Sequence, residues 1–178
     1  MTERLLSLDL STVGTGWAFF KDEKLDASGT VKATGGIEEK LKAMYKGLDL
    51  LFQRWNPDII VSEAPVFVQY QKRHKQCFLP GIEPKPKYNG NPEVFIKLCK
   101  LHGLLLSFCF SREIELHEIQ NLRWKSHFFN GNPAKVTKEQ IFTFCQRIFK
   151  PTVDTFDEAD AICIGRAFLA EYNCKCKC

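Results

Sequence analysis

The chain has 178 residues, of which 44% are hydrophobic and 12% aromatic, so it is long and apolar enough to bury a core and is not a disordered protein. Its formal net charge is +4, and we expect neither a membrane span, which needs about 18 apolar residues, nor a signal peptide. We therefore expect one globular domain over residues 1–172, a short Cys/Lys tail over residues 173–178, and a reducing, cytoplasmic location.

The N-terminal part of the chain predicts three consecutive antiparallel strands. Apolar and polar side chains alternate from Arg4 to Ser11, which is the period-2 pattern of a strand. The segments Trp17–Phe20 and Leu25–Thr34 predict the second and third strands. Asp9 stands among the leucines of the first strand. Because Asp is depleted in strands and rarely buried without a partner, this residue is a candidate for function.

A helix and a buried strand follow. Apolar residues recur every three or four positions from Ile37 to Trp55, which predicts an amphipathic helix. The short apolar run Asp58–Glu63 predicts a parallel strand that is buried on both faces. Open sheets bind ligands beyond the carboxyl ends of their strands. Glu63, at the end of this strand, is therefore the second candidate.

The stretch Val66–Asn91 is expected to be a long loop, because proline, glycine and asparagine recur in it. The region is also basic, since seven Lys and Arg residues and only two Glu lie between Gln69 and Lys100. A basic surface beside carboxylates suits a phosphodiester substrate. Lys72, Arg73 and Lys75 are the candidate DNA contacts in this loop.

The segment Pro92–Phe110 predicts a helix that is apolar on more than one face. One interpretation is a helix covered entirely by its own domain, and the other is an interface with a second copy. Gly103, near the middle, would allow a second helix to approach closely. We expect a homodimer through residues 92–110. The residues expected on approximately one side of this helix are Leu98, Leu101, Leu105 and Phe108.

The C-terminal part predicts one more strand, Ile114–Glu118, and then helices. Asn121–Phe129 favours a short helical piece, and Thr137–Gln140 has the spacing of a capping box. Thr155–Glu158 repeats this spacing before a last helix, which is expected to end near Tyr172. The order of three strands, helix, strand, helix, strand and then helices predicts an α/β fold with a mixed five-stranded sheet flanked by helices.

Two aspartates near the start of the last helix complete a group of carboxylates. Asp157 and Asp160 are three residues apart and therefore share one helix face. Buried carboxylates repel one another, so these residues with Asp9 and Glu63 indicate divalent cations. Oxygen ligands favour Mg²⁺ or Mn²⁺ over zinc, and two such ions are typical of phosphoryl transfer. Asp154 is an outside candidate, because it precedes the expected helix cap.

At this point the chain resembles the RuvC-type Holliday-junction resolvases of the ribonuclease H-like superfamily. The resemblance covers Leu5–Phe168, and the similar segments are Leu8–Trp17, Val61–Glu63, Asp157–Ile162 and, in the family's dimer-forming helix, Lys97–Gly103.

The resemblance implies the roles of individual residues. Asp9, Glu63, Asp157 and Asp160 would be the catalytic ligands of two Mg²⁺ ions, for which Mn²⁺ would substitute. Phe67 would be the aromatic residue that probes the junction. By the same resemblance, the basic DNA contacts outside the loop would be Lys125 and Lys135.

The implied function is a metal-dependent endonuclease that resolves four-way DNA junctions by paired hydrolysis and leaves 5′-phosphates. The Pro- and Lys-rich insert and the tail with Cys174, Cys176 and Cys178 are more similar to a viral or phage relative, which would act where DNA replicates in an infected host. Alternatives are a flap or fork endonuclease, a catalytically inactive junction-binding protein and an ATP-binding member of the actin-like superfamily. The four carboxylates disfavour the inactive protein, and the missing duplicated domain disfavours the ATP-binding one.

Overall fold

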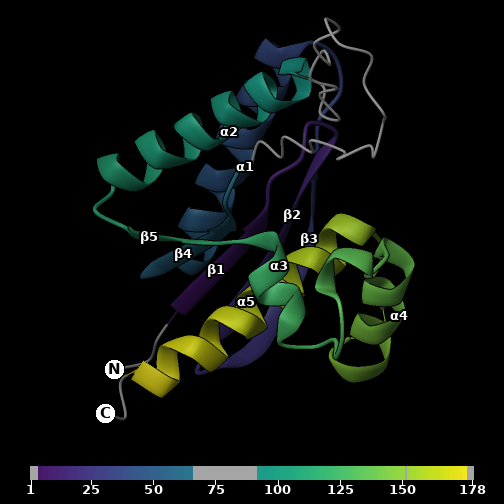
Figure 1. The fold of residues 1–178 in the computed structure, drawn as a ribbon. Coiled ribbons are helices and arrows are strands. Elements are labelled where there is room, and N and C mark those ends of the chain that lie inside the picture. The colour runs from purple at the N-terminus through teal and green to yellow at the C-terminus, as the bar shows by residue number, and fades with distance from the viewer. Residues whose placement is uncertain (1–3, 66–91, 151, 176–178) are drawn as a thin grey trace, which may run out of the picture.

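A computed structural model describes residues 4–65, 92–150 and 152–175, which fold around a mixed five-stranded sheet (Figure 1). The spatial order of the strands is β3-β2-β1-β4-β5, with β1–β3 antiparallel and β4 and β5 added in parallel to β1. The predicted sheet is therefore confirmed. The strands are β1 (Arg4–Asp9), β2 (Gly14–Lys21), β3 (Lys24–Lys32), β4 (Ile59–Glu63) and β5 (Glu115–Ile119).

Helices cover both faces of the sheet (Figure 1). On one face, α1 and α2 pack over a core that includes Leu6, Leu8 and Phe19. On the other face, α3, α4 and α5 pack over Leu5, Ala18 and Phe20, the alternate residues of the same strands. The helices are α1 (Ile37–Trp55), α2 (Pro92–Ser111), α3 (Asn121–Ser126), α4 (Lys138–Ile148) and α5 (Phe156–Lys175), with a 3₁₀ turn at Pro133–Lys135.

The glycines near the N-terminus lie in β2, although the sequence suggested that this strand begins only at Trp17. A Cβ atom on Gly16 would lie 1.9 Å from the carbonyl oxygen of Asp157, so the first turn of α5 passes directly against the strand backbone. The glycine is therefore required by a close approach of two backbones, not by a turn.

The structure corrects the prediction for α2. Leu101, Leu105 and Phe108 are buried in the core that α2 shares with α1, and Leu98 is partly buried there. These residues therefore face their own domain and not a partner. The periodicity marks an apolar stripe, but it does not say which of two stripes packs inward. By length and composition alone, α2 is the one helix among the described residues that could cross a membrane, although no span was expected from the sequence. A core helix of a globular domain meets the same criterion, and α2 contributes Leu101, Leu105 and Phe108 to the core.

Candidate active site

The two strand-end carboxylates lie at the same edge of the sheet. Asp9 ends β1 and Glu63 ends β4, and these strands are parallel neighbours. The hydroxyl of Ser7 donates to the carbonyl of Ala161 in α5 at 2.7 Å, so this face of β1 is the one that α5 covers. Asp9 follows Ser7 by two residues and lies on the same face. The sheet thus aims Asp9 toward the helix that carries Asp157.

A cavity of about 500 Å³ opens at this edge. Asp9 and Glu63 line it together with His102 of α2, and His102 Nε2 contacts the Glu118 carboxylate of β5. The volume is in the range of small-ligand sites. The lining also includes Leu10, Ala64, Pro65, Leu98, Gln120, Asn121, Leu122, Lys125 and Ala134.

Burial and the neighbouring carboxylates act in the same direction on Asp9. Burial raises the pKa of Asp9 well above its usual range, and the charges of Asp160, Glu63 and Asp157 raise this pKa further. The other three predicted carboxylates therefore lie within electrostatic reach of Asp9. Such a group is costly to ionise without added positive charge.

Asp160 shows the same effect. Burial raises the pKa of Asp160 to about 6, against the lowering effect of the ammonium groups of Lys138 and Lys125. Its Oδ1 atom is buried and has no hydrogen-bond partner among the described residues. A buried carboxylate oxygen without a donor is rare in folded proteins, and a bound cation is one way to satisfy it.

The donor chemistry of the four carboxylates fits Mg²⁺ or Mn²⁺, since both prefer oxygen ligands. The described side chains are not, however, gathered as ligands. In residues 4–65, 92–150 and 152–175, no three or more Asp, Glu, His or Cys side chains are arranged to hold one metal ion. Ion binding therefore requires the carboxylates to turn toward a common centre.

Sequence reasoning missed a cation that lies beside the carboxylates in the described part of the chain. Lys138 Nζ lies 3.6 Å from Asp157 Oδ1. Lys138 is the first residue of α4, after the predicted capping box of Thr137 and Gln140, which the structure confirms. A lysine at this position opposes the helix dipole, and this break of a local rule was the signal available in the sequence.

The two lysines named from sequence differ in their surroundings. Lys125, on α3, lines the cavity. Lys135 is exposed on the 3₁₀ turn and does not line the cavity. The candidates Phe67, Lys72, Arg73 and Lys75 lie outside the described residues. The outside candidate Asp154 is exposed, and two of the tail cysteines, Cys176 and Cys178, are outside the described part of the chain.

Glu63 is held by two donors from α3. The side-chain amide Nδ2 of Asn121 and the indole Nε1 of Trp124 each lie 2.8 Å from Glu63 Oε2. The Trp124 side chain is fully buried. The contact with Glu63 was not predicted, because it joins residues about sixty positions apart.

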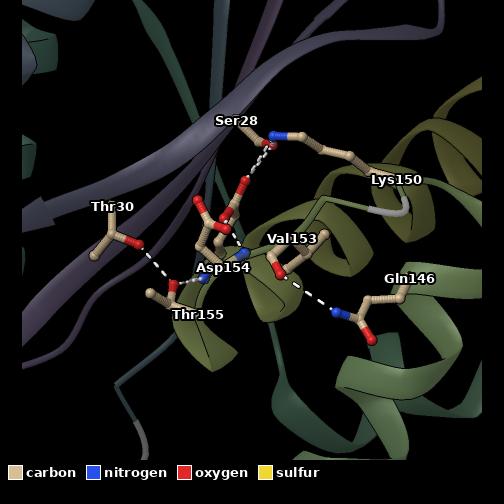
Figure 2. Close-up of polar contacts among 8 residues, drawn as sticks. Ser28, Thr30, Gln146, Lys150, Val153, Asp154 and Thr155 are labelled. Carbon is tan, nitrogen blue, oxygen red and sulfur yellow. Dashed lines mark hydrogen bonds and ion pairs between the residues drawn. The ribbon is translucent and has the colours of Figure 1, made fainter.

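The start of α5 is fixed by a buried carboxylate (Figure 2). Glu158 accepts hydrogen bonds from Ser28 Oγ at 2.6 Å, Lys150 Nζ at 2.9 Å and the Asp154 amide at 3.0 Å. The predicted capping box at Thr155 is only half formed. Thr155 Oγ1 accepts from the Glu158 amide at 3.1 Å, while the Glu158 carboxylate binds β3 and the end of the preceding loop instead. These contacts tie the first turn of α5, which carries Asp157 and is followed by Asp160, to the sheet.

No family model and no curated protein matches the chain. Solved structures do match it. Thermus thermophilus RuvC in complex with a Holliday junction substrate has a TM-score of 0.68 at 15% identity, over 97% of this chain and 96% of that chain. A second T. thermophilus RuvC structure has a TM-score of 0.66 at 12% identity, with 96% of both chains covered. The yeast mitochondrial Holliday junction resolvase has a TM-score of 0.54 at 16% identity, over 98% of this chain and 83% of that chain.

These likenesses extend over nearly the whole chain, in agreement with the resemblance in the sequence motifs. The protein therefore has the ribonuclease H-like fold of the RuvC Holliday-junction resolvases.

Proposed function

We propose that the protein is a divalent-metal-dependent endonuclease that resolves four-way DNA junctions. The observation that carries the proposal is the position of Asp9 and Glu63 at one edge of a ribonuclease H-like sheet, where the charges of Glu63, Asp157 and Asp160 all act on the buried Asp9 carboxyl and help to raise its pKa above the usual range. A packed group of carboxylates is costly in the apo protein, and a function that requires cations explains its presence. The likeness to a RuvC structure solved with a Holliday junction supports branched DNA as the substrate.

In this proposal the four carboxylates hold two Mg²⁺ or Mn²⁺ ions. The ions, when bound, supply an activated water and stabilise negative charge on the phosphate oxygens. The chain itself contributes the orientation of the ligands. Lys125 and Lys138 add positive charge beside the carboxylates, where a DNA phosphate would approach. Hydrolysis of the phosphodiester would leave a 5′-phosphate.

The proposed homodimer uses the exposed side of α2, not the buried side named from sequence. A Cβ atom on Gly103 would meet nothing within 4 Å, so a second helix backbone has room to approach there. The exposed residues on this side recur every three or four positions, as do the residues through which two packed helices contact each other. A two-fold dimer would supply one site for each of the two cuts that a junction requires. The exposed residues on this side are Ile96, Cys99, Gly103, Leu106 and Phe110.

The proposal is tested with a panel of synthetic DNA substrates: a four-way junction, a flap, a fork and a linear duplex, each with Mg²⁺ and with EDTA. We expect paired cuts on opposing strands of the junction with Mg²⁺, little cutting of the duplex and none with EDTA. Equal cutting of flaps and forks would favour the broader branched-DNA endonuclease. Tight junction binding without any cutting would favour an inactive junction-binding protein.

A further inference from the structure

We propose that Trp124 and Asn121 are positioning residues that orient the Glu63 carboxylate, and that Trp124 also sets the position of Lys125. This inference rests on the proposed function, because it gives Glu63 a role in holding a metal ion. It concerns how this chain fixes one ligand of the carboxylate group before any ion binds.

The two donors converge on one oxygen of Glu63. Asn121 Nδ2 and Trp124 Nε1 are each 2.8 Å from Oε2. The other oxygen, Oε1, has no hydrogen-bond partner among the described residues, and the side chain lines the cavity. A carboxylate offers about four acceptor positions. Occupation of one oxygen by two donors therefore fixes the side chain and leaves the second oxygen available.

Trp124 is a rigid donor. Its side chain is fully buried and packs in the core beneath α5. An indole N–H donates and cannot accept, so its partner must be an acceptor such as a carboxylate. Since packing fixes both torsions of the ring, the direction of the N–H bond is fixed as well.

The same ring also contacts the cation next to it. Lys125 Nζ lies 5.3 Å from the centroid of the Trp124 ring, which is the geometry of a cation–π contact. Lys125 lines the same cavity as Glu63. Trp124 therefore binds a negative group at its edge and a positive group at its face, and both groups belong to the candidate site.

A buried tryptophan needs some acceptor for its N–H group, and this alone would make Glu63 a structural partner. The second donor argues for more than core packing. Asparagine at a helix start commonly caps the helix, but the N-cap of α3 is Gln120, and no side chain caps this end. The amide of Asn121 is instead directed to Glu63.

The test compares Trp124→Phe with Trp55→Phe as a matched control. Phenylalanine keeps an aromatic ring, but it removes the N–H donor together with part of the indole volume at the fully buried position 124. The control makes the same change of side chain, so it reports the effect of truncating a tryptophan elsewhere in the core. Trp55 packs on Trp17 and Phe19, on the face of the sheet opposite α5. Asn121→Ala removes the second donor from a half-buried position, and serves if the Trp124 variant does not fold.

The first readout is spectroscopic and needs no DNA. The chain has three tryptophans, so Trp124→Phe assigns one indole N–H signal in a ¹⁵N-correlated spectrum. We expect Glu63→Ala to move this signal strongly, and Mg²⁺ titration of the wild type to move it more than the other two. A Trp124 signal unchanged by both perturbations would overturn the proposal.

The second readout is the metal dependence of cleavage. Loss of a contact that orients a metal ligand typically costs roughly 10–100-fold in metal affinity or activity. We expect Trp124→Phe to raise the Mg²⁺ concentration for half-maximal cutting by this factor, with junction affinity changed less than about twofold. Behaviour equal to that of Trp55→Phe would overturn the proposal. If the wild type cuts no branched DNA, only the proposed function is refuted. The indole N–H signal then still shows whether Trp124 orients the Glu63 carboxylate.

Discussion

Replacement of Asp160 by asparagine is expected to stabilise the metal-free protein while it removes a ligand. Burial raises the pKa of Asp160 to about 6 from its usual 3.8. The folded protein therefore binds the proton more tightly than the unfolded chain does. Ionisation of Asp160 costs stability, and the cost grows as pH rises through the window from 3.8 to about 6.

The magnitude follows from the difference of about 2 pH units, each equivalent to about 1.4 kcal/mol. At pH 8 the ionised side chain should lower the free energy of unfolding by about 3 kcal/mol, and at pH 4 by only about 0.5 kcal/mol. Asp160→Asn keeps the shape and removes the charge. Because the buried amide has its own desolvation cost, we expect Asp160→Asn to raise the free energy of unfolding by about 2 kcal/mol at pH 8.

The assay is urea unfolding in EDTA at pH 4 and pH 8. Asp154→Asn is the matched control, because Asp154 is an exposed aspartate just before α5. Added Mg²⁺ should stabilise the wild type by mass action and should do so less for Asp160→Asn. A gain of equal size at both pH values, or a loss of stability at pH 8, would refute the electrostatic reasoning.

Three further changes test other parts of the structure. Gly16→Ala would put a Cβ atom 1.9 Å from the backbone of α5, so we expect the free energy of unfolding, measured with urea, to fall by about 2 kcal/mol. We also expect Mg²⁺ binding, measured by calorimetry, to weaken. Lys150→Met leaves the carboxylate of Glu158 buried without its cation, which should lower the free energy of unfolding by about 2–3 kcal/mol at pH 7. Burial raises the pKa of Glu158, but hydrogen bonds and Lys150 lower it on balance. The loss of stability should therefore shrink as the pH falls below about 4.5. Leu106→Glu on the exposed side of α2 should reduce the mass in light scattering from about twice 20.5 kDa to 20.5 kDa, whereas Leu50→Glu, at an exposed position of α1, should not.

The order of the elements could be predicted because it depends on local patterns. Alternation in β1, the apolar run of β4 and the helical spacing in α1 each reflect contact with one buried face. The positions of Asp9 and Glu63 at strand ends then followed from chain topology, since parallel neighbours end at the same edge.

The contacts that refine the site could not be predicted, because they join distant parts of the chain. Nothing local to Trp124 indicates that its N–H reaches Glu63, and nothing local to Gly16 indicates that α5 passes against it. The exposed side of α2 was misassigned for a related reason. The apolar residues of α2 form two stripes along the helix. Which stripe is buried depends on α1, which packs against Leu101.

The central claim is that these carboxylates form the catalytic centre of a junction-cutting nuclease, and Asp9→Asn tests it most directly. The measurement is single-turnover cleavage of a synthetic four-way junction with Mg²⁺, beside junction affinity for the same proteins. The wild type should make paired cuts with 5′-phosphate ends. Asp9→Asn should bind the junction at least as tightly and make no detectable cut, because it lacks one ligand and one repulsive charge. Cutting by Asp9→Asn near the wild-type rate would contradict the account.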